Sequence, residues 1–166
     1  NSDLPWQDVD IFLGDERCVD PLSDESNTNM LRNSLLKNYA SKAFFCEVFK
    51  NNEFNDELAK QLYLKTLKEK CDGNPPIFDL SLLGLGDDGH TASLFPYKHI
   101  NNNDLIITSF GKGLKRISLT PKVISASSEI AFLVTGVSKN LALKRLIDNS
   151  ESTERTPARL IKCNSK

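Results

Sequence analysis

One histidine in this sequence stands where a side chain could transfer a proton to or from a bound ligand. His90 lies in FDLSLLGLGDDGHTASLFP, from Phe78 to Pro96, which we call the glycine-rich segment. Asp88 precedes His90 by two residues, and an imidazole exchanges protons near neutral pH. Asp88 could orient this imidazole, or it could cap a following helix. The residues alone leave both roles open.

Two cations elsewhere in the sequence could bind an anionic ligand. Arg17 follows Asp15 and Glu16 at the end of an expected strand. A guanidinium bonds two oxygens of a phosphate at once and stays charged. The alternative for Arg17 is an internal salt bridge with one of the two preceding carboxylates. Lys139 stands where a helix is expected to begin, and on its own it would be an ordinary exposed lysine.

The glycine-rich segment predicts a strand, a turn and a helix in succession. Residues 78–83 form a short apolar run typical of a buried strand. Glycines 84, 86 and 89 permit a sharp turn and a close backbone approach, and residues 90–94 are expected to begin a helix. An open α/β sheet binds anions at the carboxyl end of a strand, against a helix N-terminus. We therefore expect an anion-binding crevice at His90, lined by Gly86 and Gly89.

Strands and helices alternate along the rest of the chain. This pattern predicts one domain over residues 1–166, built as an open, mostly parallel Rossmann-like α/β sheet with helices on both faces. Two adjacent strands near residues 105–120 predict an antiparallel excursion. The expected strands are 9–13, 43–49, 78–83, 105–110, 116–120, 130–135 and 158–162, and the expected helices are 28–38, 57–70, 121–125 and 138–148.

Apolar residues at helical spacing predict the buried faces of these helices. Asp56 is expected to be the N-cap of the helix at 57–70. The residues expected to be buried are Met30, Leu31, Leu35 and Leu36 in the first helix, Leu58, Leu62, Leu64 and Leu67 in the second, and Leu141, Leu143, Leu146 and Ile147 in the last.

The composition is that of an ordinary globular protein. Of the 166 residues, 39% are hydrophobic and 26% charged, and 21 lysines and arginines nearly balance 22 aspartates and glutamates. This balance argues against a nucleic acid or a membrane surface as partner. The four cysteines are scattered without the spacing of metal ligands, so we expect no metal site. With no apolar run long enough to span a bilayer, we expect a cytoplasmic protein.

Four blocks of this sequence resemble the 6-phosphogluconolactonase family. The glycine-rich segment is similar to the family pattern Gly-x-Gly-x-Asp-Gly-His-x-Ala-Ser-Leu-Phe-Pro. Residues 6–19, WQDVDIFLGDERCV, resemble its Trp-x-x-Val-x-x-Phe-x-x-Asp-Glu-Arg-x-Val strand, and Ser26-Asn27 follows as in the family. Residues 116–120 and 132–139 match two later blocks. Four ordered blocks are far more specific than one glycine motif.

The resemblance implies hydrolysis of 6-phospho-D-glucono-1,5-lactone in the oxidative pentose phosphate pathway, without metal or organic cofactor. It implies that His90 is the general base that activates water, and that Arg17 and Lys139 bind the phosphate. Arg116 lies in a family block and is expected to have a secondary role in substrate binding, as is Asp15.

Members of the resembled family are longer than this sequence. They carry an amino-terminal phosphate-binding loop that we do not find, so we expect a domain that is incomplete at both ends. Because the family includes both separate proteins and fusions to glucose-6-phosphate dehydrogenase, the sequence leaves both arrangements open for the parent chain.

Two other functions remain as alternatives. Glucosamine-6-phosphate deaminase/isomerase shares the Asp-Glu and Asp-Gly-His landmarks, but its pattern has tyrosine at the position of Arg17 and Phe-Asn-Glu at the positions of residues 93–95. The other alternative is a sugar-phosphate-binding module without catalysis, for which His90 would have no purpose.

Overall fold

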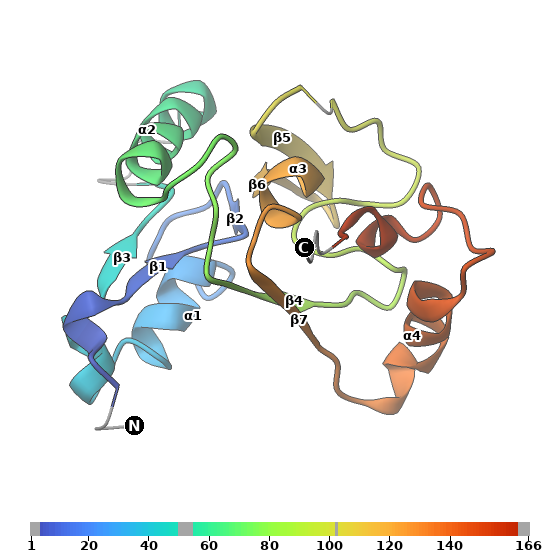
Figure 1. The fold of residues 1–166 in the computed structure, drawn as a ribbon, viewed down its shortest axis with the longest axis horizontal. Coiled ribbons are helices and arrows are strands. Elements are labelled where there is room, and N and C mark those ends of the chain that lie inside the picture. Colours follow the sequence, from blue (N-terminus) through green and yellow to red (C-terminus); the bar gives the residue numbers. More distant parts are fainter. Residues whose placement is uncertain (1–3, 50–54, 102, 163–166) are drawn as a thin grey trace.

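The structure is a computed structural model that describes residues 4–49, 55–101 and 103–162 (Figure 1). Its strands are β1 (Asp10–Phe12), β2 (Asp15–Arg17), β3 (Phe44–Cys46), β4 (Leu80–Gly84), β5 (Ile106–Gly111), β6 (Leu114–Leu119) and β7 (Glu129–Leu133). Its α-helices are α1 (Asn27–Asn33), α2 (Asp56–Lys70), α3 (Pro121–Ile124) and α4 (Asn140–Ile147), and its 3-10 helices are η1 (Trp6–Asp8), η2 (Asn38–Lys42), η3 (Val137–Lys139) and η4 (Pro157–Leu160).

The strands form parallel and antiparallel ladders, which confirms the predicted α/β class. Within the described ranges, β1 pairs with β3 and β4 pairs with β7, both in parallel, and these pairs are separate ladders. The predicted antiparallel excursion is the hairpin of β5 and β6, and β2 joins it in the order β2-β6-β5. In Figure 1, α1 and α2 lie on opposite sides of the β1 and β3 pair.

Strand β4 is buried on only one face. In β4, Leu83 is 6% exposed, whereas Leu80 and Leu82 are 51% and 59% exposed. Successive side chains of a strand point to opposite faces, so the continuous apolar run at 78–83 places its residues on both. The expectation of a fully buried strand is therefore wrong for the face that carries Leu80 and Leu82.

Helix α2 buries a different stripe from the one predicted. Its buried residues are Ala59, Tyr63 and Leu67, and of the four expected leucines only Leu67 is fully buried. Leu58 and Leu62 are 40% and 49% exposed. Tyr63 fixes this rotation of the helix because its buried hydroxyl donates to the Leu13 carbonyl at 2.7 Å.

The N-cap of α2 is Asn55 and not Asp56. The Asn55 side chain accepts from the Leu58 N–H at 3.1 Å. The Asp56 carboxylate instead lies 2.9 Å from the Lys115 ammonium on β6. A tertiary ion pair has therefore taken the residue that the local pattern assigned to the cap.

The other helices are shorter than predicted. Helix α1 ends at Asn33, five residues before the expected end, and leaves Met30 and Leu35 exposed. Helix α4 buries Ala142, whereas Leu141, Leu143 and Ile147 are 56%, 39% and 73% exposed.

No helix in the described ranges is long and apolar enough to cross a membrane.

The expected last strand at 158–162 is wrong. Residues Pro157–Leu160 form η4, and the Ala158 N–H donates to the Gly89 carbonyl at 3.1 Å. This backbone bond attaches η4 to the glycine-rich segment. Pro157 at the start of the short helix lacks an N–H group, which suits the first turn of a helix.

Two of the four leucines of α2, Leu67 and Leu62, provide a direct test of its orientation. We predict that Leu67→Ala lowers the free energy of unfolding by about 2–5 kcal/mol, because the side chain is fully buried. Leu62→Ala is the matched control and should cost less than about 1 kcal/mol. Urea denaturation of both variants measures the difference, and equal losses would contradict the observed rotation of α2.

Candidate active site

The glycine-rich segment closes on itself directly after β4. The Gly86 N–H donates to the His90 carbonyl at 2.7 Å, and the Gly89 N–H donates to the Gly86 carbonyl at 3.0 Å. The Thr91 hydroxyl donates to the Gly84 carbonyl at 2.8 Å. These bonds replace the helix predicted at 90–94, so the expectation of a helix N-terminus beside His90 is wrong. His90 is held by a compact turn instead.

Asp88 holds the imidazole of His90. Its Oδ1 lies 2.5 Å from Nδ1 of His90 and also accepts from the His90 backbone N–H at 3.1 Å. Because no helix follows the turn, Asp88 cannot be the cap of one, which was the second of its two expected roles. Because Nδ1 faces a carboxylate, Nε2 is the ring nitrogen left for another partner, and the His90 side chain is 17% exposed.

The surroundings of Asp88 favour its ionised form. Burial raises the pKa of its carboxyl, but the hydrogen bonds from the His90 ring and backbone outweigh burial and hold the pKa below the ordinary value of 3.8. An ionised Asp88 favours a proton on Nδ1 of His90, so that Nε2 carries the lone pair that a general base needs.

Two glycines make room for this arrangement. A Cβ on Gly86 would lie 1.9 Å from Nδ1 of His90, so the imidazole rests on bare backbone. Gly89 has φ +94°, and a Cβ there would lie 3.1 Å from the Cα of Thr156. Both positions are therefore restricted to glycine, the first by the close approach of a side chain and the second by backbone conformation.

Phe95 packs between His90 and the hairpin of β5 and β6. The two ring centroids lie 4.9 Å apart, and the guanidinium of Arg116 lies 5.6 Å from the Phe95 centroid. A Cβ on Gly111 would lie 2.2 Å from the Phe95 ring, so this ring fills the space that the glycine leaves. The position of His90 thus depends on the hairpin.

Asp15 joins β2 to both the glycine-rich segment and β6. Its Oδ2 accepts from the Ser93 hydroxyl at 2.5 Å and lies 3.4 Å from Nη1 of Arg116. The side chains of Asp15 and Arg116 are 16% and 7% exposed, and Ser93 is 1% exposed. Both groups of this ion pair are thus largely removed from water.

Arg17 lies beside Arg116 in the sheet. The two residues are directly opposite in the antiparallel register of β2 and β6, and opposite side chains share a face. Nη1 of Arg17 donates to the Glu25 carbonyl at 2.5 Å and to Oδ1 of Asn27 at 3.0 Å. No ion pair of Arg17 occurs among the described residues, so the salt-bridge alternative is not seen.

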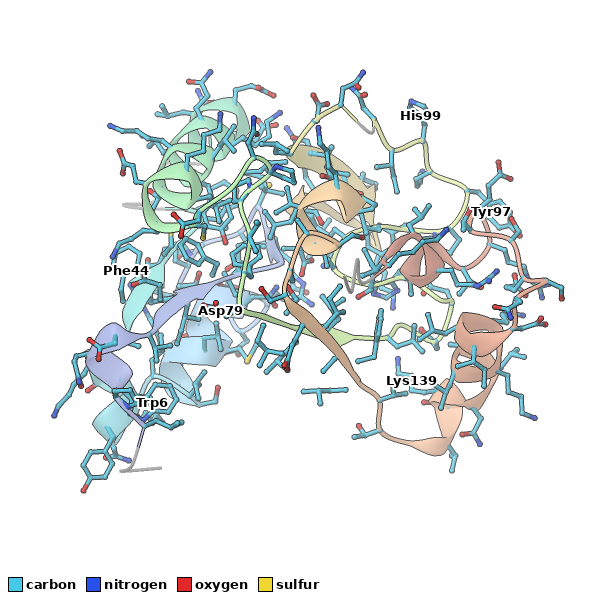
Figure 2. All side chains as sticks on the ribbon, in the orientation of Figure 1. Trp6, Phe44, Asp79, Tyr97, His99 and Lys139 are labelled. Carbon is cyan, nitrogen blue, oxygen red and sulfur yellow. The ribbon has the colours of Figure 1, made fainter. Side chains whose placement is uncertain are left out.

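Lys139 lies at the start of α4, below the glycine-rich segment in the view of Figure 2. A backbone hydrogen bond, and then the charges of Lys112 and Lys139, lower the pKa of Asp87. Lys139 is therefore within electrostatic range of the turn that carries His90. Lys112, at the tip of the β5 and β6 hairpin, lies 3.5 Å from the Asp87 carboxylate.

The second histidine is remote from these groups. His99 is exposed on the loop at the top of Figure 2. In the part of the chain that the structure describes, no three His, Cys, Asp or Glu side chains gather as metal ligands would.

The sequence patterns missed three residues of this site. Ser93 and Phe95 belong to the glycine-rich segment, but their partners Asp15, Arg116 and Gly111 come from distant strands. Lys112 was missed because an isolated lysine in a hairpin turn carries no pattern. The glycines on either side of Lys112, at positions 111 and 113, were the one available signal for a turn that could reach back over the segment.

The depressed pKa of Asp88 predicts a pH-dependent contribution to stability. The ionised carboxylate stabilises the fold above pH 3.8, and this contribution is lost as the pH falls through the lower folded-state pKa. The Tm of the native protein should therefore exceed that of Asp88→Asn near neutral pH, and the excess should shrink on acidification to about pH 2.5.

Thermal unfolding of both proteins from neutral to acidic pH measures this excess. Asp24→Asn, on an exposed loop, is the matched control for the loss of one carboxylate. A Tm difference between native protein and Asp88→Asn that stays constant over the whole range would contradict the prediction.

The chain resembles known proteins over its whole length. The model of the family described as glucosamine-6-phosphate isomerases/6-phosphogluconolactonase matches residues 1–166. A 6-phosphogluconolactonase from Nostoc sp. is 35% identical over 163 residues, which cover 95% of this chain and 68% of that protein.

Solved structures agree with the sequence match. The crystal structure of a 6-phosphogluconolactonase from Shewanella baltica has a TM-score of 0.84 at 28% identity and covers 98% of this chain and 71% of that chain. A monomeric glucosamine-6-phosphate deaminase has a TM-score of 0.65 at 19% identity, over 89% of this chain and 65% of that chain, which shows the fold alone. The chain therefore belongs to the family of glucosamine-6-phosphate isomerases and 6-phosphogluconolactonases.

Proposed function

We propose that this protein is a 6-phosphogluconolactonase, which hydrolyses 6-phospho-D-glucono-1,5-lactone to 6-phospho-D-gluconate. The observation that carries the proposal is the Asp88 and His90 pair, with Oδ1 and Nδ1 2.5 Å apart in a turn that leaves Nε2 for another partner. The names of the Nostoc and Shewanella relatives support the same reaction.

The geometry at His90 suits the activation of water. With its proton on Nδ1, the imidazole takes a proton at Nε2 from a water molecule that attacks the lactone carbonyl carbon. The resulting tetrahedral intermediate collapses with cleavage of the bond between C1 and the ring oxygen, and His90 returns the proton to that oxygen. Asp88 stabilises the imidazolium between these two transfers.

The phosphate of the substrate is assigned to Arg17 and Lys139. Arg17 has neutral oxygen acceptors at Nη1, so its positive charge is not cancelled by a carboxylate of the described chain. Arg116 is paired with Asp15 and packs over Phe95. We assign Arg116 and Asp15 the role of positioning the substrate-binding surface beside Arg17.

The deaminase alternative lacks its acidic group in the glycine-rich segment. Where the deaminase pattern has Phe-Asn-Glu, this chain has Ser93, Leu94 and Phe95, which are 1%, 0% and 6% exposed. Ser93 bonds Asp15, and Phe95 packs on His90. These positions supply neither the amide nor the carboxylate that the deaminase pattern carries there, and Arg17 stands where that pattern has tyrosine.

Several expectations from the sequence stay predictions. These are the absence of a cofactor, the cytoplasmic location, the arrangement of the parent chain, either alone or fused to glucose-6-phosphate dehydrogenase, and the contribution of Gly86 and Gly89 to substrate binding.

The proposal predicts separate effects of the base and the cation. In the full-length protein, His90→Ala should lower kcat by about a hundredfold or more, because the general base is lost. Arg17→Ala should mainly raise KM, by about tenfold to a hundredfold, because a charge-assisted bond to the phosphate is lost. The assay follows lactone generated in place from glucose 6-phosphate, with spontaneous hydrolysis subtracted.

Matched variants control for nonspecific effects. His99→Ala removes the other histidine, and Arg32→Ala removes an arginine of α1 that pairs with Glu47. Neither should change kcat or KM. Release of ammonia from glucosamine 6-phosphate without lactone hydrolysis would favour the deaminase, and binding of 6-phosphogluconate without turnover of either compound would favour the binding module.

A second prediction concerns the glycine beneath the imidazole. Gly86→Ala should lower kcat at least about tenfold, because its Cβ would lie 1.9 Å from Nδ1 of His90 and displace the imidazole. Gly84→Ala is the matched control, since a Cβ there meets nothing within 4 Å. Steady-state kinetics of the two variants would refute the proposed placement of His90 if both retained native kcat.

A further inference from the structure

Glu16 is a buried carboxylate that contacts only neutral donors in the described structure. It is 2% exposed and lies on β2 between Asp15 and Arg17. Oε1 accepts from the backbone N–H groups of Arg17 at 2.8 Å and Asn27 at 2.9 Å. Oε2 accepts from the Ser26 hydroxyl at 3.1 Å and the Thr28 N–H at 2.8 Å. Four donors therefore converge on one carboxylate.

Three of these donors belong to the segment that holds the Arg17 guanidinium. Glu16 fixes residues 26–28, and the acceptors of Nη1 of Arg17 are the Glu25 carbonyl and Oδ1 of Asn27. Asn27 is fixed a second time, because its side-chain Nδ2 donates to the Asp15 carbonyl at 2.8 Å. The carboxylate thus orders the residues that set the direction of the guanidinium.

The charges on this strand explain why such a support is needed. Arg17 lies opposite Arg116 in the ladder, and like charges that face one another across strands repel. Asp15 neutralises Arg116, whereas the acceptors of Arg17 are a carbonyl and an amide oxygen. A guanidinium held by neutral acceptors is positioned without losing its charge.

We propose that Glu16 is a positioning residue for Arg17. By binding residues 26–28, its carboxylate holds the Asn27 and Glu25 acceptors in place, and these aim the guanidinium at the phosphate of the ligand. This inference rests on the function proposed above, and it assigns Glu16 to phosphate affinity and not to the chemical step.

The test is a double-mutant cycle in the full-length protein. Glu16→Gln keeps the shape of the side chain but turns an NH2 group toward two of the four donors, so part of the segment must detach. We expect KM for the phosphorylated lactone to rise about tenfold, with kcat changed less than about threefold. In an Arg17→Ala background the same substitution should change KM by less than about twofold, because its effect passes through Arg17.

Two further variants separate positioning from general destabilisation. Glu47→Gln is the matched control, because Glu47 pairs with Arg32 of α1 and, among the described residues, forms no side-chain hydrogen bond or ion pair with residues 25–28 or with Arg17. It should leave KM unchanged. Asn27→Ala leaves Glu16 in place and should also raise KM only when Arg17 is present. Thermal denaturation shows whether Glu16→Gln is folded. If it is not, the double-mutant cycle of Asn27→Ala with Arg17→Ala provides the test.

Opposite outcomes overturn the inference. It is wrong if the effects of Glu16→Gln and Arg17→Ala on KM multiply, or if Asn27→Ala leaves KM unchanged in the native background. The same cycles measured as Kd for 6-phosphogluconate do not require turnover. A protein that shows the cycle in Kd without hydrolysing lactone would refute the proposed reaction and retain the role of Glu16.

Discussion

The half-buried Asp15 carboxylate makes the contacts on which the rest of the site depends. One oxygen accepts from Ser93 of the glycine-rich segment and pairs with Arg116 of β6, so it joins the turn that carries His90 to the strands that carry the arginines. A carboxylate that is largely removed from water is costly unless its partners are in place. The turn and the three-stranded ladder must therefore be assembled together, and His90 and Arg17 lie in one unit.

This assembly distributes charge unevenly between two neighbouring arginines. Arg116 is neutralised by Asp15 and covered by Phe95, whereas Arg17 is held by uncharged oxygens. The two have the same side chain and sit opposite each other in the ladder, but only one keeps the full charge that an anionic ligand would meet. The partners of each guanidinium, and not its residue type, decide how much positive charge it presents to a ligand.

The turn at His90 is held by short-range hydrogen bonds. Hydrogen bonds within residues 84–91 close it without a helix, so the imidazole is placed by Asp88, by the bare backbone of Gly86 and by the Phe95 ring. An imidazole held in this way is oriented before any ligand arrives, and such preorganisation would lower the entropic cost of a reaction at Nε2.

The sequence by itself determined the α/β class and the hairpin at β5 and β6, because these follow from local periodicity. It left the role of Asp88 open between orienting His90 and capping a helix, and the structure pairs its carboxylate with the imidazole. The sequence also determined the family, through four ordered blocks. It did not determine which face of α2 is buried, since Tyr63 reaches Leu13 fifty residues away, nor that residues 90–94 avoid a helix. The contacts of Asp15, Phe95 and Arg17 were decided only by tertiary structure, because each joins residues from different elements, and the energy of such a contact exists only once the strands are brought together.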